Sequence, residues 1–471
     1  MDIRFGTDGW RGVMGRDFTF ENVRRVAQAI ADYLRSEILK DPNRKKSPWT
    51  APVVVSYDRR FQSEVFAREI AQVLEGNKLS AWLLSEAAPT PAVSLLTQRS
   101  QGLGIVVTAS HSPASCNGIK IKFAGRAATE AMTQAIEACL DRNQPIRATE
   151  IKEKPGRDAY LQHLRAKADL SAIRTGLKRP VVVDYLYGSA AGFLEDLLPA
   201  SRLIVLHGVH DPLFGGLTPE PVADNLKELA ARVKAEKAAA GIALDGDGDR
   251  VGVLDEAGNY LTPCQVFPML LAHLVERKKL KGKIVQSVSL GYLSARFARA
   301  HGLAFEELPV GFKHISERLA SGDAVIGGEE SGGYAWQGGL QDRDGLRAGL
   351  LLMEMMAVTG RTLGQMWKDI EAKYGHSHFK RLDLKLHKPV GDKVAFTAKL
   401  IKKLPKKILG SEIQSLSELD GLKIVLAGDH WLLLRPSGTE PLLRVYAESD
   451  SAKRTAELLE LAKKWAGPTL A

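Results

Sequence analysis

The sequence predicts an α/β protein of several domains that ends in an α+β domain. Short apolar runs alternate with amphipathic helical windows over most of the chain, which is the pattern of α/β layering. After about Gly375 the pattern changes to alternating side chains and closely spaced strands. At 471 residues the chain also exceeds what one hydrophobic core usually organises. We therefore expect domains over residues 1–152, 153–258, 259–375 and 376–471.

The first two domains show the alternation most plainly. In the first, Thr19 is placed to cap a helix that carries Val23, Val26, Ile30 and Leu34 on one face. A strand over 52–57, a helix over 64–74, a strand over 104–107 and a helix over 130–140 follow. In the second domain we expect strands at 181–184 and 203–206, helices at 190–198 and 225–240, and a strand that ends in an acidic loop.

The last two domains differ from each other in pattern. The third reads as helix 265–278, strand 283–288, helix 292–300, strand 324–326 and a long helix over 346–357. In the fourth, Phe379, Leu382, Leu384 and Leu386 approximate strand alternation, and strands at 423–426, 431–434 and 442–447 precede a terminal helix. This last section therefore predicts an α+β domain.

The composition indicates an ordinary compact protein. Hydrophobic residues make up 45% and charged residues 25%, and no apolar run is long enough to span a membrane, so we expect a cytoplasmic protein without a membrane partner. Cys116, Cys139 and Cys264 have no C-x-x-C spacing and are expected to be reduced. The net charge of +10 comes from scattered basic residues, densest over 402–407, which favours a solvated surface over a nucleic-acid groove.

The most informative segment is the acidic loop at 245–250, which reads Asp-Gly-Asp-Gly-Asp-Arg. Asp245, Asp247 and Asp249 offer only oxygen, which suits Mg²⁺, and three ligands leave positions open for a phosphate oxygen. An EF-hand calcium loop has the same spacing, and Glu256 stands at its twelfth position. That reading fails because Arg250 stands where the turn needs glycine, and because a strand rather than a helix precedes the loop.

Three further loops carry functional groups. Ser110 follows the strand at 104–107 with His111 beside it, so it is the leading nucleophile, although a serine turn punctuated by Pro113 is the simpler reading of this segment alone. The segment 435–441 puts arginine, two hydroxyls and a glycine in one turn, which suits a phosphate monoester. The segment 328–333 gathers carboxylates and a hydroxyl among glycines, which suits sugar hydroxyls. By themselves, the last two also read as ordinary loops.

Five segments taken together resemble the α-D-phosphohexomutase superfamily, which includes the phosphoglucomutases and phosphomannomutases. They are 5–12 (Phe-Gly-Thr-Asp-Gly-Trp-Arg-Gly), 108–111 (Thr-Ala-Ser-His), 245–250, 328–332 (Gly-Glu-Glu-Ser-Gly) and 435–439 (Arg-Pro-Ser-Gly-Thr). The resemblance spans nearly the whole chain. It implies three related α/β/α domains with mixed sheets and a C-terminal α+β domain of the TATA-binding-protein-like type around a central cleft.

The resemblance also implies roles for individual residues. Ser110 resembles the serine that carries the phosphoryl group, and Ser110 with Asp245, Asp247 and Asp249 resembles the Mg²⁺ site. The positions that line the reaction centre match Arg11, His111, Lys120 and Arg250, with Lys120 a candidate proton carrier. Glu329 and Ser331 match the superfamily's sugar-binding pair, and Lys313 resembles a further lysine of the cleft. The residues that match the site for the phosphate that is not being transferred are Arg435, Ser437, Gly438 and Thr439.

Two positions depart from the superfamily's pattern. Ser112 stands where relatives usually have asparagine, and Cys116 precedes the usual Asn-Gly-x-Lys segment. The support that this asparagine gives to the serine loop is therefore in question, although a serine can replace some of its hydrogen bonds. We expect activity to survive the change.

The function implied is a Mg²⁺-dependent phosphohexomutase that interconverts hexose 1-phosphate and hexose 6-phosphate. Phosphorylated Ser110 would give a 1,6-bisphosphate intermediate, and glucose 1,6-bisphosphate would also serve as activator. Glucose is the first choice of sugar because of Glu329-Glu330-Ser331-Gly332, and phosphomannomutase and phosphoglucosamine mutase are the alternatives. A metal-dependent serine phosphatase is a more distant alternative, and a polyanion-binding protein without catalysis is another. We expect a monomer or homodimer whose partner is a small phosphosugar.

Overall fold

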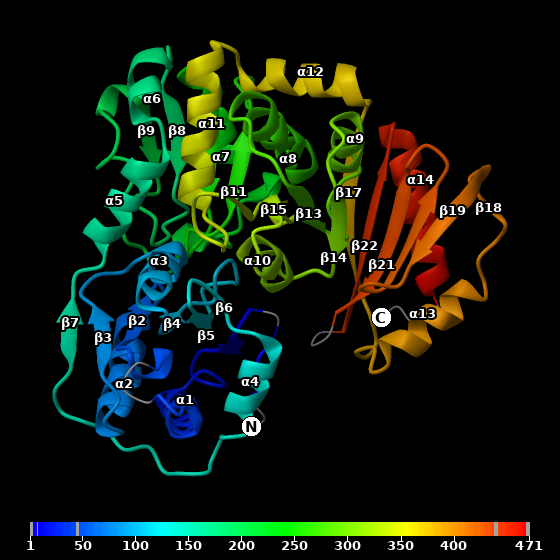
Figure 1. Cartoon of the computed structure of the whole chain (residues 1–471). Helices are drawn as coiled ribbons and strands as arrows, with labels where there is room; N and C mark the ends of the chain where they lie inside the picture. Colours follow the sequence, from blue (N-terminus) through cyan, green and yellow to red (C-terminus); the bar gives the residue numbers. More distant parts are fainter. Residues whose placement is uncertain (1–2, 7, 44–46, 438–440, 468–471) are drawn as a thin grey trace. The chain divides into compact units, whose positions relative to one another are not determined.

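The computed structural model describes residues 3–6, 8–43, 47–437 and 441–467 (Figure 1). These residues divide into two compact units. The first comprises Met1–Leu261 with Gly332–Leu363, and the second Thr262–Ser331 with Gly364–Ala471. Within the described ranges, no helix combines the length and the apolar character that crossing a membrane requires.

The first sheet is mixed and has the strand order β1-β5-β4-β2-β3-β7, with β6 beside β5. Strands β2, β3, β4 and β7 run parallel, whereas β1 and β4 are antiparallel to β5. Because β4 and β5 are antiparallel neighbours, the segment 108–115 that leaves β4 enters β5 at the same edge of the sheet. The strands are β1 (Trp10–Val13), β2 (Val53–Tyr57), β3 (Ala81–Leu84), β4 (Leu103–Val107), β5 (Cys116–Phe123), β6 (Arg126–Ala127) and β7 (Lys152–Lys154).

The helices of this section cover the sheet with the apolar faces that the sequence predicts. The Thr19 hydroxyl accepts a hydrogen bond from the Asn22 N–H at 3.2 Å, which confirms the predicted cap of the first helix. Val23, Val26 and Ile30 on its inner face are fully buried. The helices are α1 (Phe20–Lys40), α2 (Ser63–Gly76), α3 (Thr90–Ser100) and α4 (Glu130–Glu137), with a short 3₁₀ turn, η2 (Pro48–Thr50).

The second sheet, also in the first unit, has the order β12-β11-β10-β8-β9. Its strand β8 is parallel to β9 and β10, and β11 is antiparallel to β10, so the loop from β10 to β11 is a tight return at one edge. The strands are β8 (Val181–Asp184), β9 (Leu203–Leu206), β10 (Ala240–Leu244), β11 (Val251–Leu254) and β12 (Tyr260–Leu261). The unit also contains α5 (Arg157–Lys167), α6 (Leu170–Gly176), α7 (Lys227–Ala235), β16 (Tyr334–Trp336), α11 (Gly345–Thr359) and the 3₁₀ turns η3 (Ala200–Arg202), η4 (Phe214–Gly216) and η5 (Ala223–Asn225).

Two helix predictions in this section are wrong. Residues 190–198 form successive turns, because Gly192 has φ +86 and no continuous helical ladder passes it. The helix expected over 225–240 is only α7, because Lys237 has φ +48 and the Ala239 N–H then bonds to the Pro180 carbonyl. In both segments the apolar spacing was compatible with a helix, and backbone reversals decided otherwise.

The second unit contains three parallel strands, which follow its first helix. Strand β13 lies between β14 and β15, and is parallel to both. The helix predicted over 265–278 is α8 (Pro263–Leu271) continued by a π-helical stretch, η6 (Ala272–Arg277), and Pro268 within α8 has no N–H to donate. The remaining elements are β13 (Lys283–Ser287), α9 (Leu293–Ala300), β14 (Phe305–Leu308), α10 (Phe312–Ala320), β15 (Ala324–Gly328) and α12 (Leu363–Tyr374).

The C-terminal section is an antiparallel sheet with helices packed against it, as the sequence predicts. Its strand order is β17-β22-β21-β20-β19-β18, and α14 packs on β22, β21 and β17 while α13 packs on β20 (Figure 1). The core between sheet and helices includes Leu432, Val445 and Leu458. The elements are β17 (His378–Lys385), α13 (Lys393–Ile401), β18 (Lys407–Ile408), β19 (Ser411–Ser417), β20 (Leu422–Leu426), β21 (Trp431–Pro436), β22 (Leu442–Ser449) and α14 (Ala452–Ala466).

A histidine at the end of β9 should make stability depend on pH. His207 Nδ1 lies 2.8 Å from Asp184 Oδ1, and Nε2 lies 3.3 Å from Glu228 Oε2. The hydrogen bond to Asp184 raises the pKa of His207. Protonated His207 then adds to the free energy of unfolding. This contribution is complete below the pKa of about 6.5 that histidine has in the unfolded chain, and it is lost as pH rises through the pKa of His207 in the folded protein. We expect urea unfolding to show this loss in the wild type and a flatter pH dependence in His207→Gln; equal pH dependence of the two proteins would contradict it.

Candidate active site

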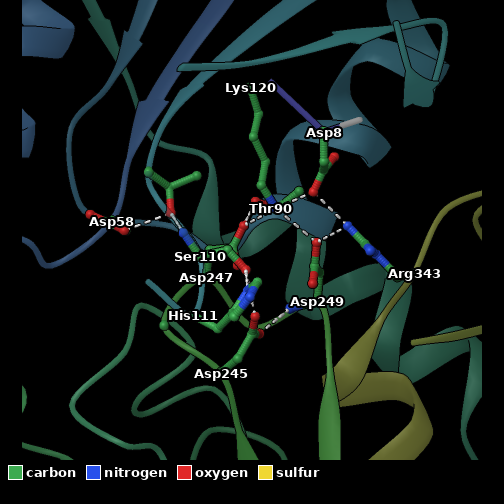
Figure 2. Close-up of polar contacts among 12 residues, drawn as sticks. Asp8, Asp58, Thr90, Ser110, His111, Lys120, Asp245, Asp247, Asp249 and Arg343 are labelled. Carbon is green, nitrogen blue, oxygen red and sulfur yellow. Dashed lines mark hydrogen bonds and ion pairs between the residues drawn. The ribbon is translucent and has the colours of Figure 1, made fainter. Parts of the chain in front are cut away.

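The three aspartates of the acidic loop meet at one point. The loop follows β10, and Asp245, Asp247 and Asp249 each offer a carboxylate oxygen within 4.8 Å of the others. All three side chains are buried. The alternation of aspartate and glycine lets the chain turn back to β11 while it directs three carboxylates to one side (Figure 2). The structure thus brings together the predicted metal ligands.

Ser110 lies against this loop. It follows β4, is fully buried and has φ +53, a left-handed conformation that is uncommon outside glycine. Its Oγ donates to Asp245 Oδ2 at 2.8 Å, and His111 Nδ1 lies 3.3 Å from the same Oγ. The approach requires glycine at position 246, because a Cβ there would stand 2.5 Å from the Ser110 carbonyl oxygen. The serine loop and the acidic loop are therefore in close contact.

Lys120 occupies the centre of the carboxylates. It points from β5, is almost fully buried, and its Nζ lies 2.9 Å from Asp8, 2.7 Å from Asp247 and 3.0 Å from Asp249 (Figure 2). On the far side, Arg343 bridges Asp8 and Asp249 at 2.7 and 2.8 Å. Two cations thus hold three carboxylates of this cluster in a fixed arrangement.

Sequence reasoning missed three members of this cluster. Thr90, at the start of α3, donates through its hydroxyl to Asp247 Oδ2. Asp8 stands inside the 5–12 segment that carried the resemblance, but no role was expected for it. Arg343 lies between two aspartates in an Asp-Arg-Asp segment, a signal that has no meaning until the fold brings it to the acidic loop.

Burial and neighbouring charges shift the pKa values of the clustered groups in different directions. Burial acts to lower the pKa of Lys120, but Asp247, Asp249 and Asp8 outweigh it and raise that pKa. Burial acts to raise the pKa of Asp247, and Lys120 overcomes it and lowers that pKa. The pKa of Asp245 is raised well above its usual value by burial and by the other two aspartates. Arg250 and Lys120 act to lower the pKa of Asp245 but do not outweigh these effects.

The donor set fits a hard divalent cation. Among the described residues, neither Asp247 Oδ1 nor Asp249 Oδ1 has a hydrogen-bond partner, although both are buried. A buried carboxylate oxygen without a partner is costly, and a cation with oxygen ligands removes that cost. With Asp245 Oδ2 beside Ser110 Oγ, these atoms supply the all-oxygen set that suits Mg²⁺.

The other predicted residues of the reaction centre also lie in the first unit. Arg11, on β1, donates to the Ser112 hydroxyl at 3.2 Å. Arg250 directly precedes the return strand β11, and its N–H donates to Asp245 Oδ1 at 3.1 Å. Burial, followed by the nearby Arg250 and Arg11, holds the pKa of His111 well below its usual value.

The predicted sugar and phosphate groups lie in the second unit. Glu329, at the end of β15, is buried and accepts from the Gly311 N–H at 2.9 Å, and Ser331 follows two residues later. Arg435, on β21, donates through Nε to Asp420 Oδ2 at 2.6 Å, which sets the plane of its guanidinium. Also in this unit are Lys313, on α10, and Ser437, which is buried. The remaining predictions, Gly438 and Thr439, lie outside the described residues.

Four family models match the chain in consecutive segments. They describe phosphoglucomutase/phosphomannomutase alpha/beta/alpha domain I (residues 2–147), domain II (158–258), domain III (263–374) and the C-terminal domain (393–463). Together they account for most of the chain and for the observed order of three α/β sections and an antiparallel C-terminal section.

Curated relatives and solved structures match over nearly the full length. A phosphoglucomutase/phosphomannomutase from Thermococcus kodakarensis is 28% identical over 98% of this chain and 97% of its own. A probable phosphoglucosamine mutase from Pyrococcus abyssi is 30% identical over the same shares. The solved structure of a candidate phosphomannomutase from Thermus thermophilus is 32% identical, with a TM-score of 0.86 and 99% of each chain covered.

Proposed function

The chain belongs to the phosphoglucomutase/phosphomannomutase family, and on that premise we propose that it is a phosphohexomutase acting through a phosphorylated Ser110. The observation that carries the proposal is the contact between Ser110 and the acidic loop. A buried serine hydroxyl 2.8 Å from one of three clustered aspartates is placed to carry a phosphoryl group beside a divalent cation. A bound Mg²⁺ would neutralise negative charge on that group.

The proposed reaction is a pair of phosphoryl exchanges. In the first, the bond from phosphorus to Ser110 Oγ breaks while a bond forms to the 6-hydroxyl of a hexose 1-phosphate. That hydroxyl loses its proton, and Ser110 Oγ regains one. The resulting 1,6-bisphosphate turns over, and its 1-phosphoryl group passes to Ser110 by the reverse exchange. His111 and Lys120 are the groups beside the serine and the acidic loop that can carry a proton.

We assign the second unit to substrate recognition. Glu329 and Ser331 would accept and donate hydrogen bonds to sugar hydroxyls, and Lys313 would add a cation. Arg435 and Ser437, with Gly438 and Thr439, would hold the phosphate that is not being transferred. A second phosphate-binding site is needed because the intermediate carries two phosphates, of which only one at a time can react with Ser110.

The relatives favour glucosamine or mannose phosphate over glucose phosphate as the substrate. Relatives at 30% identity, from three archaea including Pyrococcus abyssi, are named as probable phosphoglucosamine mutases, and the Thermus structure is described as a phosphomannomutase candidate. Glucose phosphate stays a second candidate because Glu330 belongs to the Glu329-Glu330-Ser331-Gly332 segment, which is the basis for choosing glucose from the sequence. The Glu330 carboxylate accepts from Ser287 and Ser289, so it is held within the second unit beside the predicted sugar-binding pair.

Parallel assays of three substrates test both the proposed reaction and the identity of the sugar. The Mg²⁺-loaded protein would receive glucosamine, mannose and glucose 1-phosphates in turn, each with a trace of its 1,6-bisphosphate, and both 6-phosphate and free phosphate would be followed. We expect 6-phosphate without free phosphate, with the highest kcat/KM for glucosamine or mannose. Free phosphate alone would overturn the mutase in favour of a phosphatase, and the highest kcat/KM for glucose would overturn the sugar assignment.

Replacing Arg435, in the proposed second phosphate-binding site, should weaken substrate binding more than it lowers the stability of the fold. The Arg435 side chain is buried but is tied by Asp420 at one edge of its guanidinium. We expect Arg435→Ala to raise KM about tenfold or more, since a charge-assisted phosphate contact is lost, and to release bisphosphate into solution. Steady-state kinetics and chromatography of the free bisphosphate measure both effects. Arg444→Ala, on the neighbouring strand, is the control, and equal KM for the two variants would remove the role of Arg435.

A further inference from the structure

The backbone of Ser110 is held on both of its sides. Its N–H donates to the Thr108 hydroxyl at 2.8 Å, and its carbonyl accepts from Arg60 Nη2 at 2.6 Å. A non-glycine residue in the left-handed region persists only where its surroundings determine its conformation. The groups that contact this peptide therefore decide where Ser110 Oγ points.

Arg60 uses all of its donors on this loop and on one aspartate. Nη2 donates to the carbonyls of Ser110 and Ser112, Nη1 to those of Pro113 and Cys116, and Nε to Asp58. The five N–H groups of a guanidinium are thus all engaged. The side chain has no exposed surface, and the ring of Phe214 lies 4.9 Å from its Cζ. A guanidinium so fully engaged has no freedom to move independently of the serine loop.

Asp58 connects the two sides of the Ser110 peptide. Its Oδ2 accepts from Arg60 Nε at 3.1 Å and from the Thr108 hydroxyl at 2.6 Å, while Oδ1 accepts from Ser63. Burial raises the pKa of Asp58, and Arg60 and Thr108 oppose that effect. Because all of these partners donate, the carboxylate form is the one that fits the site. Asp58 therefore fixes Arg60 and Thr108, which in turn hold the serine.

We propose that Asp58, Arg60 and Thr108 are positioning residues that hold the left-handed Ser110 with its Oγ against the acidic loop. The hydrogen bonds that define this support run to the serine and its neighbours and not to the aspartates of that loop, so the three residues act through the serine. The proposal rests on the proposed function, because it concerns the geometry of the phosphoryl carrier. It predicts that loosening this support slows phosphoryl transfer while substrate binding is retained.

Thr108→Val provides the sharpest test because it removes one hydroxyl and keeps the shape of the side chain. The hydroxyl is the only link from Asp58 to the Ser110 N–H among the contacts of the described residues. We expect kcat to fall by about 100-fold with KM within about threefold of wild type, since a misplacement of about 1 Å can cost that much. Thr108→Ser restores the hydroxyl and should recover most of kcat. Amide hydrogen exchange at residues 110–116 should be faster in Thr108→Val than in Thr108→Ser.

Arg60→Lys, with Arg347→Lys as its matched control, tests the other side of the peptide. Arg347 is equally buried, but it packs on Trp336 and bonds to that residue's carbonyl. Both variants are expected to lose stability. Only Arg60→Lys should lose kcat beyond its loss of folded protein, measured by circular dichroism, and raise the share of free phosphate. Equal kcat losses in the two variants would reduce Arg60 to a support of the fold.

The outcomes separate this inference from the proposed function. If the wild type interconverts hexose phosphates and Thr108→Val keeps its kcat, the positioning role is overturned and the mutase stands. If the wild type has no mutase activity, the proposed function fails. The hydrogen-exchange comparison of Thr108→Val with Thr108→Ser then still decides whether this hydroxyl holds the Ser110 peptide, and equal exchange would overturn that as well.

Discussion

Ser110→Ala should abolish the interconversion of hexose 1-phosphate and hexose 6-phosphate while it leaves the fold intact. Among the described residues, the Oγ atom has hydrogen-bond partners only in Asp245 and His111, and the substitution removes this one atom. The variant cannot hold a phosphoryl group, and we expect the rate to fall by about 10³-fold or more. The measurement is the rate of 6-phosphate formation from the preferred 1-phosphate with a trace of bisphosphate.

The matched control for this variant lies on the same loop. Ser115 is exposed, and within the part of the chain that the structure describes its one hydrogen bond is from the Met14 N–H to its carbonyl. Ser115→Ala should therefore keep the wild-type rate within about twofold, as surface substitutions usually have small effects. Residual activity of Ser110→Ala close to that of the control would show that another group carries the phosphoryl group.

Lys120→Met should have the second largest effect, on stability as well as on activity. The Nζ of Lys120 is the buried cation between Asp8, Asp247 and Asp249. Its removal leaves the buried Asp247 without its ion pair, whereas Arg343 still pairs with Asp8 and Asp249. Breaking a buried ion pair by removing one partner costs about 3–5 kcal/mol. We expect a loss of that size in the free energy of unfolding in EDTA, and a fall in activity of about 100-fold or more.

Magnesium should separate this effect from an ordinary loss of stability. Lys122, two residues further along β5, is equally buried and pairs with Asp342 instead of the acidic loop. If Asp245, Asp247 and Asp249 bind Mg²⁺, the added cation should restore more stability to Lys120→Met than to Lys122→Met. Urea unfolding of both variants with EDTA and with excess Mg²⁺ measures the difference. An equal gain in both would mean that the cation binds elsewhere.

Local patterns were sufficient where one segment carries its own signal. The capping position of Thr19 and the apolar spacing of Val23, Val26 and Ile30 are properties of neighbouring residues, and α1 forms as expected. The helix expected over 190–198 does not form, and the cause is also local. Gly192 adopts a left-handed conformation, which interrupts a helix. Apolar spacing reports which side chains are buried, and a series of turns can bury the same ones.

The sequence by itself determined the fold class and the family. It also predicted the groups that we propose to carry the chemistry, because Ser110 and the Asp245-Gly-Asp-Gly-Asp249 run are recognisable by residue type and spacing. Only the tertiary structure decided which distant groups join them. Arg343 and Asp8 lie 335 positions apart and share one ion pair, and Arg60 reaches Ser110 across 50 positions. Such contacts depend on the pairing of β4 with β2 and on the packing of sections that are remote in the chain, and no local pattern encodes them.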